Sequence, residues 1–112
     1  MLARANRLVS ADDYRTVLRR GRRVATANTV VSILDTGSGT MARFGFIVTR
    51  KVGNAVSRNR VRRRMKAIAR ELVDGGVRGV DVVVRALPDA ASANWATLHS
   101  EITAAMDGST RR

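Results

Sequence analysis

The chain has 112 residues, with 21 Lys or Arg against nine Asp or Glu, which gives a formal net charge of +12. The length suits one domain over residues 1–112 with a single modest core, and the absence of Cys excludes disulfides and thiolate metal sites. A charge this high is tolerated most readily by a protein that meets a polyanion, so nucleic acid is the first candidate partner.

The first stretch of the chain predicts a basic arm and a helix. Residues 1–9 form a short basic arm, and Ser10 followed by Asp13 is typical of a helix start, so we expect a helix over residues 11–20 that ends at Gly21. Four cations lie at this end of the helix. They either form a solvated turn that matches the helix dipole or contact phosphate directly, and both alternatives remain open. These cations are Arg19, Arg20, Arg22 and Arg23.

Two segments rich in β-branched and aromatic residues follow. Residues 24–34 predict a strand, residues 35–40 a loop, and residues 44–48 a second strand that pairs with the first as a hairpin. In the second strand Phe44 and Phe46 alternate with smaller residues, so both should point to one face, and we expect them in the core.

The next segment predicts a two-faced helix over residues 54–73, with Asn54 as its N-cap and glycines after its end. Seven of the thirteen residues from Arg58 to Arg70 are Lys or Arg, and none is acidic. Helical spacing places an apolar stripe on one side and a polar, cationic face opposite. The stripe is Val61, Met65, Ile68 and Leu72, and the opposite face carries Asn59, Arg63, Lys66 and Arg70. A face without acidic partners indicates anion binding.

The last third of the chain completes an α+β two-layer sandwich. Residues 80–86 predict a strand buried on both faces, joined to the preceding strand by a helical crossover, and Pro88 with Asp89 introduces a last helix. We expect residues 108–112 to be a disordered tail. The last helix should have Trp95, Leu98, Ile102 and either Ala105 or Met106 on its apolar side. Helices on one face would leave part of the other sheet face free for an extended ligand.

Membrane association and catalysis by the protein find little support in the sequence. No segment approaches the about 18 apolar residues of a membrane span, and no secretory signal is visible, so we expect a cytoplasmic protein without a membrane partner. The one histidine, His99, has no metal-ligand companions, and the nine carboxylates show no motif spacing, so no catalytic or metal-binding residue is assigned. Arginine-rich surfaces suit folded RNA, although charge alone does not choose RNA over DNA.

One run of residues resembles a known family. Residues 50–56, RKVGNAV, followed by the arginines and Asn59 of the basic helix, resemble the RNR signature of the protein component of bacterial ribonuclease P. The resemblance extends over nearly the whole chain. The supporting residues are Arg58, Asn59, Arg60, Arg62 and Arg63 in the helix, and Asn6, Arg7, Leu8, Asp13, Tyr14, Gly21, Arg43 and Gly45 upstream.

The resemblance implies a fold and an activity. The family is a ribonucleoprotein enzyme that removes the 5′ leader of precursor tRNA, and its RNA subunit carries the catalytic centre and needs magnesium. The protein would be non-catalytic, would bind no cofactor itself and no DNA, and would join one catalytic RNA. The implied fold is a small, mostly antiparallel four-stranded sheet in the order helix, three strands, helix, strand, helix, with a left-handed crossover that departs from the usual right-handed rule.

The resemblance also implies two sets of contact residues. Contacts to the catalytic RNA would come from Lys51, Asn54, Arg58, Asn59, Arg60, Arg62, Arg63 and Lys66. The precursor leader would lie in a cleft between the first helix and the open sheet face, lined by Tyr14, Leu18, Val30, Ser32 and Phe46. Family members often carry aromatic residues where this chain has Leu18 and Ser32, so we expect Tyr14 to supply most of the base stacking. The alternatives are a structural ribosomal protein and a nuclease that acts alone.

Overall fold

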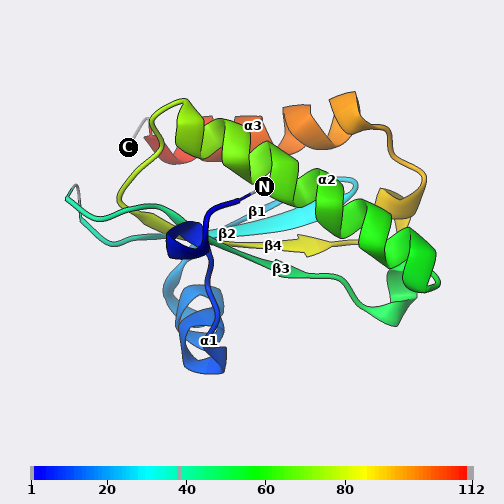
Figure 1. The fold of residues 1–112 in the computed structure, drawn as a ribbon, viewed down its shortest axis with the longest axis horizontal. Coiled ribbons are helices and arrows are strands. Elements are labelled where there is room, and N and C mark those ends of the chain that lie inside the picture. Colours follow the sequence, from blue (N-terminus) through cyan, green and yellow to red (C-terminus); the bar gives the residue numbers. More distant parts are fainter. Residues whose placement is uncertain (1, 38, 111–112) are drawn as a thin grey trace.

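The computed structural model describes residues 2–37 and 39–110 and shows an α+β fold in the predicted element order (Figure 1). The helices are α1 (Ala11–Arg20), α2 (Ala55–Asp74) and α3 (Trp95–Thr110), and the strands are β1 (Arg22–Ala25), β2 (Thr29–Asp35), β3 (Arg43–Ile47) and β4 (Val80–Ala86). Three short 3-10 turns are η1 (Arg4–Asn6), η2 (Arg50–Val52) and η3 (Pro88–Ala91).

The sheet has the strand order β1-β2-β4-β3. β1 pairs with β2 and β2 pairs with β4 in antiparallel fashion, whereas β3 runs parallel to β4, which confirms a mostly antiparallel sheet and a crossover through α2. The predicted hairpin between residues 24–34 and 44–48 is wrong, because β4 lies between them and Phe44 pairs with Val82. A strand that is apolar on both sides gains most from the central position, where both of its faces are covered.

The predicted strand over residues 24–34 is in fact two strands, β1 and β2, joined by a tight turn at residues 26–28. A carboxylate from α3 holds this turn. Thr26 Oγ1 donates to Glu101 Oε1 at 2.5 Å, and Asn28 Nδ2 donates to Glu101 Oε2 at 2.6 Å. Since Glu101 is more than 70 residues away along the chain, the local sequence does not show the break.

The helices lie on both sides of the sheet. α2 and α3 cover one face, and α1 lies on the opposite side (Figure 1). There Val17 packs on Val83. α1 thus adds a partial third layer to the predicted two-layer sandwich and covers part of this face, and the rest of the face is free, as expected. The main core lies between the sheet and the α2–α3 layer, and its buried residues include Val31, Ile33, Phe44, Val61, Met65, Ile68, Val82, Val84, Leu98 and Ile102.

The predicted basic arm packs against the domain. Leu2 and Leu8 are buried, and the Leu8 N–H donates to the Phe44 carbonyl at 2.9 Å. The Arg7 guanidinium turns back to donate to the Leu2 carbonyl. The arm therefore occupies part of the outer edge of β3, which lacks a neighbouring strand on that side.

The last helix differs from the prediction at both ends. Pro88 begins the separate turn η3, and α3 begins at Trp95, whose side chain is 39% exposed although it was predicted to lie in the apolar side. The rest of that side is buried as predicted, from Leu98 to Met106. α3 extends to Thr110 and so includes residues 108–110, the first part of the predicted disordered tail, which stays a prediction. Residues 111–112 lie outside the described residues.

Candidate nucleic-acid interface

The start of α2 is fixed by its own loop. Asn54 Oδ1 accepts from the Ser57 N–H at 2.9 Å, which confirms the predicted N-cap. Gly53 has φ 149°, a conformation that side chains rarely adopt, and its carbonyl accepts from Arg58 Nη1 at 3.0 Å. η2, which carries the exposed Lys51, is thereby held against the helix N-terminus, where the helix dipole and the cations both favour an anion.

The predicted catalytic-RNA contacts share one surface of α2 and the loop before it. Lys51, Asn54, Asn59, Arg60 and Arg63 are exposed, and Arg58, Arg62 and Lys66 are half-buried. Over the described residues, an α2 arginine pairs with a carboxylate only in the last turns, where Arg70 lies 3.6 Å from Asp74. The cations between residues 58 and 66 therefore have no carboxylate to neutralise them.

Tyr14 anchors α1 to the edge of β3. Its hydroxyl oxygen accepts from the Phe46 N–H at 3.2 Å, and its ring lies against Gly45. A Cβ at Gly45 would lie 2.5 Å from the Tyr14 ring, so this strand position has room only for glycine while the ring stays in place. Tyr14 is half-buried and keeps part of its ring accessible.

The five predicted leader contacts do not share one face. Val30 and Ser32 lie on the α1 side of β2, whereas Phe46 lies on the opposite side of β3, with the main core. Ser32 is only 1% exposed, and its Oγ has no hydrogen-bond partner among the described residues. On this face Leu18, which is 37% exposed, and the half-buried Val30 are accessible to a ligand, whereas Ser32 is not.

A hollow of about 200 Å³ instead joins members of the two predicted sets. Tyr14 and Phe46 line it from α1 and β3, and Arg62 and Lys66 line it from α2, with the N-terminal arm completing the wall. Two aromatic rings thus lie beside two cations that were assigned to a different partner. This hollow connects the basic face of α2 with the α1 side of the sheet.

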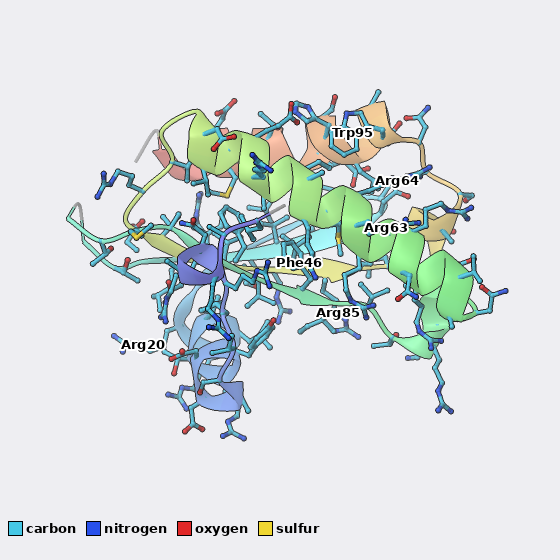
Figure 2. All side chains as sticks on the ribbon, in the orientation of Figure 1. Arg20, Phe46, Arg63, Arg64, Arg85 and Trp95 are labelled. Carbon is cyan, nitrogen blue, oxygen red and sulfur yellow. The ribbon has the colours of Figure 1, made fainter. Side chains whose placement is uncertain are left out.

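Sequence reasoning missed Arg85, an exposed cation in the otherwise buried central strand β4 (Figure 2). The strand register aligns Arg85 with Val30 and Ile47 in one row on the α1 side of the sheet. A lone arginine inside a nearly continuous apolar run was a visible signal, because a cation there must reach solvent. The uncovered part of this face is therefore cationic as well as apolar.

A second missed feature is the ion pair between Arg43 and Asp81, which lie on neighbouring strands. Arg43 Nη2 donates to Asp81 Oδ2 at 2.7 Å and Nε donates to Oδ1 at 3.0 Å, while Nη1 lies 3.4 Å from Asp13 Oδ2 on α1. The hydrogen bond to Asp81 raises the pKa of Arg43 above its ordinary value, although burial acts in the opposite direction. The cluster ties α1 to the sheet beside Tyr14.

The one histidine, His99, contacts side chains of α2 and α3. His99 Nε2 lies 3.1 Å from Glu71 Oε2, and its ring centroid lies 5.9 Å from that of Trp95. Within residues 2–37 and 39–110, no three or more His, Asp or Glu side chains come together in a way that could hold a metal ion. No helix in this part of the chain is long and apolar enough to cross a membrane.

Fold and surface together define a small basic α+β protein whose cations are concentrated on one helix that packs on a mixed sheet. The Ribonuclease P family model matches residues 2–109, and the chain belongs to that family. It is therefore a component of ribonuclease P, an endoribonuclease of tRNA processing with an RNA partner in its holoenzyme.

Curated relatives agree with this assignment, and solved structures agree with the fold. The chain is 46% identical over 111 residues to the ribonuclease P protein component of Clavibacter michiganensis, with 99% of this chain and 98% of the relative covered. The fold resembles that of the RNase P protein of Staphylococcus aureus, with a TM-score of 0.82 at 22% identity over 95% of this chain and 96% of the other. For the Thermotoga maritima RNase P protein the TM-score is 0.74 at 24% identity, over 87% and 91%.

Proposed function

We propose that this protein binds the catalytic RNA of ribonuclease P through α2 and steadies the 5′ leader of precursor tRNA on the α1 side of the sheet. The RNA subunit, with its magnesium ions, performs the cleavage, and one protein joins each catalytic RNA in the cytoplasm. The protein contributes cations and an apolar surface rather than a reacting group.

The observation that carries this proposal is the contrast between two neighbouring helices. α2 and α3 pack on the same sheet face through buried side chains such as Met65 and Leu98. Residues 95–107 of α3 contain no Lys or Arg, whereas residues 58–70 of α2 contain seven. Solubility would not require such an asymmetry, but phosphate neutralisation would, because each neutralised phosphate releases counterions from the RNA.

Geometry at the N-terminus of α2 also suits a phosphate backbone. The cap at Asn54 and the bond from Arg58 to the Gly53 carbonyl hold the loop, so the cations do not have to be ordered from a mobile segment when RNA binds. Pre-ordering reduces the conformational entropy lost on binding. Arginine can then grip phosphates through two parallel hydrogen bonds.

The leader is assigned to the side of the sheet that carries Tyr14, Leu18, Val30 and Arg85. Tyr14 is held at a fixed angle by Gly45 and the Phe46 N–H, so its ring is ready to stack on a base. The hollow shared with Arg62 and Lys66 lets one strand of RNA pass from this face towards α2. Leader and catalytic RNA would thus meet the protein on adjoining surfaces.

Reconstitution with the catalytic RNA of the same organism tests the proposal. Without the protein, repulsion between two RNA polyanions weakens substrate binding, above all at low salt and low magnesium. We expect the added protein to tighten precursor tRNA binding and to lower the magnesium concentration needed for cleavage. The protein alone, freed of nucleic acid, should not cleave precursor tRNA. Unchanged binding together with an unchanged magnesium requirement would contradict the proposal.

A further inference from the structure

Trp95 is the one tryptophan of the sequence, and it stands at the first residue of α3 with 39% of its surface exposed. The residues that continue its side of the helix, Leu98 and Ile102, are fully buried. The indole therefore lies at the edge of the core, with His99 on one side of it at a ring-centroid distance of 5.9 Å and solvent on the other. Its remaining surface is free for a ligand.

Cations of α2 surround the exposed part of the indole. A shallow hollow of about 270 Å³ is lined by Trp95, Ala67 and three arginines, which are Arg60, Arg63 and Arg64. Figure 2 shows Trp95 at the start of α3, close to the part of α2 that carries Arg64. The short side chain of Ala67, itself exposed, leaves the space beside the ring open.

The two helices are held in register at this point. Arg64 Nη1 donates to the Ala93 carbonyl at 2.8 Å, so the segment that leads into α3 is attached to α2. Arg60 and Arg63 make no hydrogen bond or ion pair with any described residue, and the nearby Glu71 is engaged by His99. The hollow therefore combines a fixed aromatic ring with two guanidinium groups that have no partner.

A ring with free guanidinium groups beside it matches the chemistry of an unpaired nucleotide. The base offers a flat face that stacks on an indole, and the adjoining phosphate accepts paired hydrogen bonds from arginine. A base inside a double helix has no free face, which excludes duplex RNA as the occupant. A membrane surface is also a poor match, because the apolar part of the hollow is limited to one ring and one alanine.

We propose that Trp95, Ala67, Arg60 and Arg63 form a binding site for one unpaired nucleotide of RNA, on the flank of α2 that faces α3. The site rests on the proposed RNA-binding function and adds to it a stacking contact in a hollow separate from the one that Arg62 and Lys66 share with Tyr14. Arg64 acts as a positioning residue, since it attaches the segment before Trp95 to α2.

Intrinsic fluorescence of the full chain tests this site, because all tryptophan emission comes from Trp95. The probes are an oligoadenylate RNA of about ten nucleotides and an abasic ribose-phosphate oligomer of the same length. Both should bind through their phosphates. We expect oligoadenylate to quench the emission in a saturable way and the abasic oligomer to leave it nearly unchanged, because only a stacked base contacts the indole.

Two variants sharpen the test. Trp95→Ala should bind oligoadenylate about fivefold to 100-fold more weakly with an unchanged salt dependence, since stacking is lost and no phosphate contact is removed. Ala67→Leu fills the hollow without altering charge, so it should reduce the quenching of the retained tryptophan. Trp95→Phe keeps a smaller ring and should bind with intermediate affinity, and circular dichroism verifies that each variant is folded.

The experiment can overturn the nucleotide site without overturning the proposed RNA-binding function. If saturating oligoadenylate binds but leaves Trp95 emission unchanged, or if folded Trp95→Ala binds as tightly as the unchanged protein, the site is overturned while RNA binding stands. If neither oligomer binds, the proposed function and the site fail together. Equal quenching by both oligomers would also overturn base stacking, because the abasic oligomer has no base.

Discussion

The two faces of the sheet differ in how far helices cover them. The face towards α2 and α3 is closed, with Val31, Val82 and Val84 buried beneath two helices. The face towards α1 is covered only in part, and its uncovered row contains Val30 and Arg85. The first face is buried in the core, and the charge on that side is carried by the outer surface of α2. The second face is itself partly exposed to solvent.

This difference separates stability from recognition. On the closed side, the side chains that pack and the exposed cations Arg60 and Arg63 are on opposite sides of α2, so these two cations could change without loss of the core. On the α1 side, Tyr14 packs on Gly45 and is also the proposed base-stacking residue. On the closed side, we expect each mutation to affect either stability or RNA binding. On the α1 side, we expect a single mutation to affect both.

Truncation of the closed core should have the largest effect. Met65→Ala on α2 and Leu98→Ala on α3 should each lower the free energy of unfolding by about 2–5 kcal/mol, because both side chains are fully buried and each change leaves a cavity. Urea unfolding followed by circular dichroism measures this loss. Val30→Ala on the open face, where the side chain is half-buried, is the control and should cost less. A similar loss at all three positions would remove the contrast between the faces.

The ion pair under α1 should give the next largest effect. Asp81→Asn leaves Arg43 without its main partner and should lower the free energy of unfolding by about 1–3 kcal/mol, less than for a fully buried pair because the Arg43 side chain is 38% exposed. The pKa of Arg43 is raised, so the stability linked to its charge is present at neutral pH and is lost only at strongly alkaline pH. Urea unfolding should therefore show a constant difference between pH 6 and pH 9. A difference that disappeared over this range would contradict the assigned role of Arg43.

Charge removal from α2 should affect binding and spare stability. The double variant Arg60→Ala, Arg63→Ala should bind the catalytic RNA about tenfold to 100-fold more weakly and show a shallower salt dependence, because two phosphate contacts are lost. Filter binding at several salt concentrations measures both quantities. Arg15→Ala on α1 removes an exposed cation that already pairs with Asp12, so it controls for net charge and should change affinity little. Because Arg15→Ala removes one charge and the double variant removes two, a loss of log affinity in Arg15→Ala half as large as in the double variant would indicate attraction by overall charge alone.

The smallest effect should come from the open face and should depend on the substrate. Tyr14→Ala should weaken precursor tRNA binding to the holoenzyme by about 1 kcal/mol, at the lower end of typical stacking energies, while mature tRNA binding changes less. This preference should depend weakly on salt, in contrast to the α2 variants. Tyr14→Phe keeps the ring and loses the acceptor for the Phe46 N–H, so it should retain the preference. Equal losses for precursor and mature tRNA would argue against a leader site here.

Local patterns predicted the elements whose determinants are local. Ser10 and Asn54 cap α1 and α2 as their sequences indicate, and the stripe from Val61 to Ile68 is buried. The apolar run of residues 80–86 is a strand covered on both faces, with Arg85 as its exposed exception. The basic side of α2 follows from the same periodicity, because one stripe must be buried and the other then meets solvent.

Features set by distant parts of the chain could not be predicted in this way. The break between β1 and β2 depends on Glu101, and the order of the sheet depends on β4 entering between β2 and β3. The same insertion sets which way β3 faces, so Phe46 lies away from Val30 although both were assigned to one cleft. Trp95 has helical spacing with Leu98, yet it lies at the helix start, where the core ends.

The central position of β4 has a consequence for synthesis on the ribosome. A nascent chain that ends before residue 80 can form β1 with β2, but β3 has no neighbouring strand with which to pair. The apolar stripe of α2 has at that stage no completed sheet to cover, while all seven cations of residues 58–70 have already been made. The basic segment is therefore complete before the strand that its sheet needs has been made, and the last third of the chain closes the domain.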